Sequence, residues 1–355
     1  MVSLEELVQQ LVERGGSDLH LSAGSPPMMR INGRLVGTDS EVLDPETSKK
    51  LIYSILDNEQ IRQFEKEQEL DMGFGISGLG RFRTNVLYQR GSVGAVLRVI
   101  PDRIPAMEQL GLPAEVLEQI CMKKSGLVLV TGATGSGKST TLASMIDYIN
   151  THRNDHIVTI EDPLEFVHRN KNCLVTQREV GTDTSAFVSA LRRVLRQDPD
   201  VILVGELRDL DSISAALTIA ETGHLTFGTL HTIDAVQSIN RLIDVFPAHQ
   251  QQQVRTQLSF TLEATICQQL VARADGKGRA LAAETLIATP AVRALIRDDK
   301  AHQLTSIIQT GSKVGMRTMN QSLNELYRTR QITFEEAISR SNDVEELKRV
   351  FQRQS

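Results

Sequence analysis

The segment Gly132-Ala133-Thr134-Gly135-Ser136-Gly137-Lys138-Ser139-Thr140 has the residue types and the spacing to bind the phosphates of a nucleotide. It fits the pattern G-x-x-x-x-G-K-[ST], whose glycines let backbone N–H groups close around a β-phosphate at the N-terminus of a helix. In this chemistry Lys138 reaches the β- and γ-phosphates, and the Ser139 hydroxyl is a ligand for Mg²⁺. The residues predicted to bind nucleotide are Gly132, Thr134, Gly135, Ser136, Gly137, Lys138, Ser139 and Thr140.

The sequence on both sides of this loop supports the prediction. The apolar run at 126–130 is typical of a buried strand, and residues 142–149 continue at helical spacing. A glycine turn can join a strand to a helix by chance. Strand, glycine loop and helix in this order are nevertheless the context in which the pattern binds phosphate.

Polar residues follow three further apolar runs in the same half of the chain. The runs 156–160, 201–204 and 225–230 lead into Glu161-Asp162-Pro163-Leu164-Glu165, Gly205-Glu206 and His231. Strands that alternate with helices predict a parallel sheet covered on both faces, and ligands bind beyond the carboxyl ends of such strands. We therefore expect these side chains and the glycine loop to converge on one edge of the sheet.

Glu206 ends a short apolar strand, where a carboxylate can orient an attacking water or hold Mg²⁺ through water. The alternative is a solvated glutamate that caps the next helix. Glu161, Asp162 and Glu165 either assist the metal and the water or are exposed loop charges.

Two histidines are candidates for the same site. His231, at a strand end, can sense the γ-phosphate or bond to one of the carboxylates. His224 either does likewise or has a structural role, since a lone histidine is more often structural.

Three arginines on predicted strands of the first domain are candidates of another kind. A hydrolysis transition state spreads charge over the γ-phosphoryl oxygens, which an arginine from a neighbouring subunit can stabilise. Arg81 and Arg83 share a strand face, and Arg98 lies on the next strand. They either reach a neighbouring subunit's nucleotide or are outward-facing sheet residues. Arg208, after Glu206, is predicted to be a surface or ion-pair residue.

Composition excludes several classes of protein. The net charge of −5 gives no overall attraction to nucleic acid or anionic lipid, and the absence of Trp with 4% aromatic residues disfavours stacking of single strands. Cys121, Cys173 and Cys267 lie far apart, so neither a zinc site nor a disulfide framework is indicated. No window approaches 18 apolar residues, which predicts a cytosolic protein without a membrane span.

The chain is expected to contain two domains and a helical tail. Residues 1–100 predict a small α+β domain with an antiparallel sheet and an Asn32-Gly33 hairpin turn. Three prolines mark 101–113 as an interdomain linker. Residues 114–290 form the predicted nucleotide-binding α/β domain, and 291–355 a helical C-terminal region.

Four segments together carry a family resemblance. They are Gly132 to Thr140, Thr159-Ile160-Glu161-Asp162-Pro163-Leu164-Glu165, Val204-Gly205-Glu206-Leu207-Arg208-Asp209 and Thr222-Gly223-His224-Leu225-Thr226-Phe227-Gly228-Thr229-Leu230-His231-Thr232. These resemble, in order and spacing, the Walker A, Asp, Walker B and His boxes of the secretion-superfamily motor ATPases. Within that superfamily the chain is most similar, along nearly its whole length, to the type IV pilus retraction ATPases.

The resemblance implies a homohexamer that hydrolyses ATP with Mg²⁺, with nucleotide sites between an N-terminal PAS-like domain and a RecA-like domain. It gives Glu206 the role of catalytic glutamate and His231 that of the His-box histidine near the nucleotide. Arg83 and Arg98, with Arg81 as a weaker match, correspond to arginines that approach the site. Closure about a hinge at 101–113 would produce motion.

The implied function is pilus retraction from the cytoplasmic face of the inner membrane, with the pilus platform protein (PilC-like) as partner and no nucleic acid. The retraction motif after Thr289 matches in part, because Val292 and Ala294 stand where the family has Ile and Asn. The alternatives are an accessory retraction ATPase (PilU-like), a secretion or pilus assembly ATPase, a nucleic-acid translocase and a non-hydrolysing nucleotide switch. Assembly ATPases resemble longer chains that often carry a four-cysteine zinc insertion.

Overall fold

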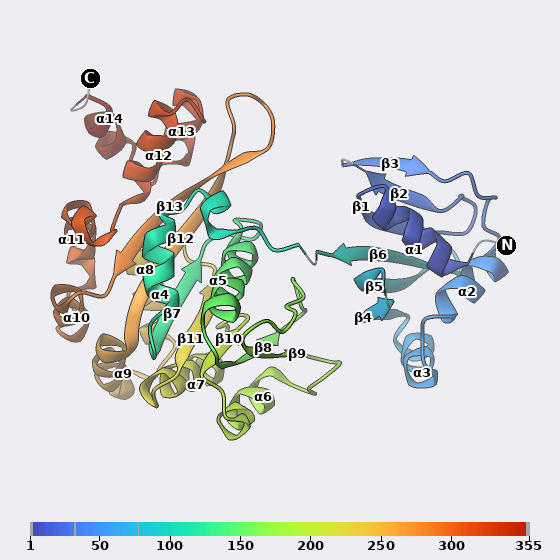
Figure 1. Ribbon diagram of the computed structural model, residues 1–355, viewed down its shortest axis with the longest axis horizontal. Helices are drawn as coiled ribbons and strands as arrows, with labels where there is room; N and C mark the ends of the chain where they lie inside the picture. Colours follow the sequence, from blue (N-terminus) through green and yellow to red (C-terminus); the bar gives the residue numbers. More distant parts are fainter. Residues whose placement is uncertain (1–2, 32, 77, 102, 353–355) are drawn as a thin grey trace. The chain divides into compact units, whose positions relative to one another are not determined.

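The computed structural model describes residues 3–31, 33–76, 78–101 and 103–352, and it divides into two compact units (Figure 1). The first unit comprises Met1–Arg103 together with the short segment Pro163–Val167. The second comprises Ile104–Asp162 and His168–Ser355. Each unit has a hydrophobic core of its own.

The first unit is built on a six-stranded antiparallel sheet in the order β3-β2-β1-β6-β5-β4. Its elements are α1 (Leu4–Glu13), β1 (Gly16–Leu21), β2 (Met28–Ile31), β3 (Arg34–Gly37), α2 (Pro45–Tyr53), α3 (Asn58–Glu67), β4 (Glu69–Ile76), β5 (Gly80–Gln89) and β6 (Ser92–Ile100). Capping residues start the helices, since Ser3, Asp44 and Asp57 each accept a hydrogen bond from the backbone of the first turn. Asn32, of the predicted hairpin turn, lies outside the described residues.

The second unit contains a seven-stranded sheet in the order β13-β12-β7-β11-β10-β8-β9. Its strands are β7 (Gly126–Thr131), β8 (His156–Glu161), β9 (Leu174–Glu179), β10 (Val201–Val204), β11 (Leu225–Leu230), β12 (Leu262–Ala272) and β13 (Arg279–Ile287). All neighbours pair in parallel except β12 with β13. The predicted α/β class with a mostly parallel sheet is confirmed.

Helices cover both faces of this sheet (Figure 1). Those of the main body are α4 (Ala114–Cys121), α5 (Lys138–His152), α6 (Phe187–Val194), α7 (Leu210–Glu221), α8 (Ala235–Asp244) and α9 (Ala248–Thr261). Along β7, Leu127 and Leu129 pack in the core with α6 to α9, whereas Val128 and Val130 pack with α4 and α5. Because side chains alternate along a strand, strands buried on both faces are continuously apolar.

The β12–β13 hairpin was not predicted from the sequence. β12 begins at Leu262, directly after α9 ends at Thr261, so neither Gly nor Pro marks the change from helix to strand. The remaining helices are α10 (Pro290–Arg297), α11 (Leu304–Thr310), α12 (Met319–Arg328), α13 (Phe334–Arg340) and α14 (Val344–Gln352). The last three pack against Val271, Ala280 and Ala282 of the hairpin.

Within the described part of the chain, no helix combines the length and the apolar character needed to cross a membrane.

Candidate nucleotide site

The glycine loop joins β7 to α5, as the sequence predicts. Gly137 stands at the N-cap of α5 with φ 93°, and Gly135 has φ 77°, both in the left-handed region that favours glycine. A Cβ atom at Gly132 would lie 2.3 Å from the backbone oxygen of Gln268 and 2.6 Å from Ser136 Oγ. A side chain at Gly132 would therefore displace the loop, and the backbone conformation favours glycine at Gly135 and Gly137.

The polar groups of the loop fit a phosphate ligand. Lys138 Nζ donates hydrogen bonds to the carbonyl oxygens of Gly132 (2.8 Å) and Ala133 (3.0 Å), which keeps the ammonium group over the loop. Ser136 Oγ is buried and has no hydrogen-bond partner among the residues that the structure describes. A buried hydroxyl without a partner is costly, and a phosphate oxygen is a suitable acceptor for it.

A cavity of about 330 Å³ borders the loop. Residues of other elements also line the cavity, among them Ile233, Gln268, Arg279, Met319 and Arg340. Arg279 Nη1 donates to the carbonyl oxygen of Gly135 at 3.5 Å. The hairpin and the C-terminal helices thus form the wall opposite the glycine loop.

Glu206, directly after β10, lies in a charged cluster. Its Oε2 is 2.9 Å from Arg208 Nε, and its Oε1 is 3.0 Å from His231 Nε2. The Glu206 side chain is 26% exposed, so its carboxylate is partly shielded from water. The hydrogen bond and the charge of Glu206 raise the pKa of Arg208. Two partners, one on each oxygen, fix the orientation of the carboxylate.

The sheet register explains why Glu206 and His231 meet. Val204 of β10 pairs with Gly228 of β11, and the backbone N–H of Leu207 donates to Thr229 at 3.0 Å. The chain after β10 therefore runs beside the end of β11, and His231 follows that end. Sequence separation is 25 residues, yet the parallel register makes the two side chains neighbours.

The glycine loop and the Glu206 cluster are electrostatically coupled. Burial lowers the pKa of Lys138, and the negative charge of Glu206 partly opposes this effect. Since β7 and β10 both pair with β11, the loop and Glu206 emerge at the same edge of the sheet. Lys138, Glu206 and His231 therefore lie at one edge of the sheet, as the sequence predicts.

The three acidic residues after β8 have different surroundings. Glu161 is the last residue of β8, is 8% exposed and accepts a hydrogen bond from Gln177 at 3.4 Å. Asp162 lies 3.7 Å from Arg208 and so extends the Glu206 cluster. Glu165 belongs to the segment that groups with the first unit, and its role stays a prediction.

The candidate arginines all lie in the first unit. Arg83 on β5 pairs directly opposite Arg98 on β6, which places two like charges side by side. Arg98 also forms a 2.7 Å ion pair with Asp18 of β1, although its own side chain is 67% exposed. Arg81 pairs opposite Ile100. Their approach to a nucleotide stays a prediction.

His224 is not brought to the Glu206 cluster. It immediately precedes β11, whereas His231 follows it, so the length of a six-residue strand, about 20 Å, separates the two. Its Nδ1 lies 3.1 Å from both the Ile219 carbonyl oxygen and Thr222 Oγ1. These contacts close the turn after α7, which is a structural role in this chain.

The sequence analysis did not identify the contacts of two residues near the site. Gln268 on β12 closes over Gly132 through its backbone oxygen, and its Nε2 donates to Thr141 of α5 at 2.6 Å. Arg208 was predicted only as a surface or ion-pair residue. Its place two residues after Glu206 could have indicated the pairing.

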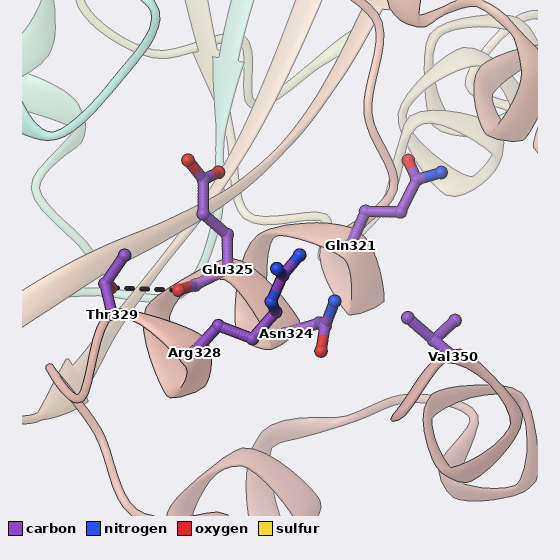
Figure 2. Close-up of a pocket in the computed structure, with 6 residues that line it drawn as sticks. All are labelled: Gln321, Asn324, Glu325, Arg328, Thr329 and Val350. Atoms are coloured by element: carbon purple, nitrogen blue, oxygen red, sulfur yellow. Dashed lines mark hydrogen bonds between the residues drawn. The ribbon is translucent and has the colours of Figure 1, made fainter. Parts of the chain in front are cut away.

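A second cavity, of about 450 Å³, lies away from the glycine loop. Figure 2 shows Gln321, Asn324, Glu325, Arg328 and Thr329 from α12 and the residue after it, with Val350 of α14 facing them. Thr329 Oγ1 donates to the backbone oxygen of Glu325 at 2.9 Å. This hollow therefore belongs to the C-terminal helices.

Comparison with known proteins places these features in a family. The family model "Type II/IV secretion system protein" matches residues 2–352. The chain is 50% identical, over 92% of its length and 94% of the relative, to the type IV pilus retraction ATPase PilT of Pseudomonas aeruginosa. It is 43% identical, over 98% of its length and 91% of the relative, to the type IV pilus ATPase PilU of the same organism.

A solved structure is similar over both units. The crystal structure of the pilus retraction motor PilT with bound ADP matches with a TM-score of 0.92 and 50% sequence identity, covering 98% of this chain and 100% of that one.

Proposed function

The chain belongs to the type II/IV secretion system protein family, and we propose that it is an ATP-hydrolysing motor that retracts type IV pili. The observation that carries the proposal is the edge of the parallel sheet at which the glycine loop and the paired Glu206 and His231 emerge together. Half of the residues are shared with a retraction ATPase over nearly the whole chain, which supports retraction as the work done.

In the proposed reaction the glycine loop and Lys138 bind the phosphates of ATP, and Thr134, Ser136 and Thr140 contribute polar groups of the same loop and helix start. Ser139, the second residue of α5, would hold Mg²⁺. When bound, the ion would neutralise part of the phosphate charge.

Glu206 orients the attacking water. An ionised carboxylate has about four acceptor sites, and Arg208 and His231 occupy one on each oxygen. The remaining sites can accept hydrogen bonds from a water aligned with the γ-phosphate. Glu161 and Glu165 are proposed to support this carboxylate, Glu161 from the neighbouring strand end. His231 reports on the γ-phosphate through Glu206, whereas the contacts of His224 favour the turn described above.

The working assembly is proposed to be a homohexamer at the cytoplasmic face of the inner membrane, acting on the pilus platform protein. Arg83, Arg98 and Arg81 would approach the nucleotide of a neighbouring subunit. The position of Arg83 opposite Arg98 supports this role, because an anion beside them would meet two positive charges, of which Asp18 already pairs with one.

The test is steady-state ATP hydrolysis by the wild-type chain and by Glu206→Ala, with particle mass measured by light scattering. We expect Glu206→Ala to lose about 100-fold or more in kcat and to keep ADP affinity within about twofold, because binding depends on the loop and chemistry on the water. A comparable loss of ADP affinity would contradict this division of roles. A wild-type monomer without turnover would contradict the motor itself.

An accessory role beside a second retraction ATPase is the other candidate function, supported by the match to PilU over 98% of the chain. Expression in a cell that lacks all retraction ATPases separates the two. A motor restores twitching alone, whereas an accessory ATPase restores it only when a second retraction ATPase is present.

A further inference from the structure

Glu284, in the middle of β13, is a buried carboxylate that bonds to the N-terminus of one helix and lies near that of another. It is 7% exposed, and its Oε1 accepts a 2.9 Å hydrogen bond from the backbone N–H of Ala235. The backbone N–H of Met319 also lies near this carboxylate and favours its charged form. Ala235 and Met319 are the first residues of α8 and α12, where backbone N–H groups have no partner within the helix. Burial raises the pKa of the Glu284 carboxyl, and the two donors oppose that rise.

The α8 terminus leads directly to the catalytic cluster. Ala235 is four residues after His231, and the residues between them form no helix or strand. Thr232 Oγ1 lies 2.7 Å from Ser238 Oγ in the first turns of α8. Ser238 Oγ also lies 3.5 Å from Thr131 Oγ1, the last residue before Gly132. The position of α8 therefore affects the segment that carries His231. Through Ser238 and Thr131, α8 also contacts the residue before the glycine loop.

The α12 terminus is fixed to the same strand. Ser322 Oγ accepts a 3.0 Å hydrogen bond from the backbone N–H of Ala283, and Arg317 Nε donates to the Ala283 oxygen at 3.2 Å. Thr285 and Arg317 form an isolated β-bridge. A displacement of α12 must therefore move β13, and Glu284 with it.

We propose that Glu284 is a positioning residue for ATP hydrolysis, which holds the α8 N-terminus so that His231 meets Glu206, and which links the C-terminal helices to that geometry. This inference rests on the proposed function. Without the carboxylate, the backbone N–H of Ala235 is buried unpaired, and the α8 terminus loses one of the contacts that hold it in place. A shift of that terminus separates His231 from Glu206 and leaves the glycine loop able to bind phosphate.

The experiment compares Glu284→Ala and Glu284→Gln with a matched control, Glu263→Gln. Glu263 lies on β12 of the same hairpin, and its carboxylate pairs with Arg293 at 2.7 Å and Lys123 at 2.9 Å, near the end of the sheet opposite the site. We expect Glu284→Ala to lower kcat about tenfold or more, with KM for ATP and ADP affinity within about twofold. Glu284→Gln, which keeps an acceptor oxygen, should lose less. Glu263→Gln should lower the thermal midpoint and leave kcat within about twofold.

A double-variant cycle asks whether Glu284 acts through His231. If it does, adding Glu284→Ala to His231→Ala lowers kcat by less than about twofold further, since the interaction is already lost. Multiplicative losses in the cycle would overturn the proposal, as would an equal fall in kcat for Glu284→Ala and Glu263→Gln. If Glu284→Ala does not fold, the same cycle is run with Glu284→Gln, and an unchanged kcat there overturns the proposal. A wild-type chain that hydrolyses no ATP would refute the proposed function, a separate result.

Discussion

The two ends of the parallel sheet in the second unit carry the same kinds of side chain and use them differently. At the amino end, His156 Nδ1 donates to the carbonyl oxygen of Asp198 at 3.1 Å, its Nε2 lies 2.9 Å from Thr176 Oγ1, and its backbone N–H donates to Asp200. His224 closes a turn at the same end. At the carboxyl end, His231 pairs with Glu206 beside the glycine loop.

The difference lies in what each histidine bonds to. Backbone carbonyls and hydroxyls at the amino end tie the rings into turns, which stabilises the connections between helices and strands. The carboxylate at the carboxyl end lies at the same edge of the sheet as the glycine loop, and its charge acts on Lys138. A titratable residue at a strand end therefore indicates function only when its partner is another reactive group.

The sharpest test of this comparison is His231→Ala. Loss of its bond to Glu206 leaves the carboxylate held on one oxygen only, so we expect kcat to fall about 10-fold to 100-fold with ADP affinity nearly unchanged. His231→Gln, whose amide can still donate, should retain part of the activity. Steady-state kinetics together with ADP titration measures both quantities. An unchanged kcat would show that the bond between His231 and Glu206 does not contribute to hydrolysis.

His168, a buried residue in the segment between β8 and β9, should make the stability of the fold depend on pH. Burial lowers its pKa to about 4 from the ordinary value of 6.5, so the unfolded chain binds a proton more readily than the folded one. Stability is fully present above the unfolded pKa and falls as pH drops through the window from 6.5 to about 4, by about 2 kcal/mol at about pH 5.

Urea unfolding at several pH values measures this window. His168→Phe, which cannot take up a proton, should reduce the dependence of the free energy of unfolding on pH. The dependence that is left should come from the carboxylates. A variant with the same acid sensitivity as the wild type would show that His168 does not titrate there.

The smallest effect is expected for His224→Gln. An amide can replace the imidazole in the turn after α7, so we expect kcat within about twofold of wild type and a loss of about 1 kcal/mol or less in stability. Steady-state kinetics measures kcat, and thermal unfolding measures the change in stability. A tenfold loss of kcat would mean that the amino end contributes to catalysis, and the contrast between the two ends would fail.

Much of the fold could be predicted because its signals are local. The apolar runs that became β7, β8, β10 and β11 have lengths and boundaries that follow from burial on both faces, and capping residues such as Asp44 start helices by bonding their own first turn. β12 had no such signal, since its first residue continues from a helix without a break.

The candidate site was predictable where a short motif carries it and not where long-range packing does. The sequence alone determined the glycine loop, because only glycine has room at Gly132 and because the glycines let backbone N–H groups close around a phosphate. It also determined that a carboxylate and a histidine would each follow a strand and lie at the same edge of the sheet.

Only the tertiary structure decided which residues act together. The strand register brought His231 to Glu206, left His224 at the far end of β11 and joined Asp162 to Arg208. Helix packing placed Glu284 against the N-terminus of α8. These pairings depend on segments far apart in the chain, whose contacts are fixed by sheet register and helix packing rather than by any local run of residues.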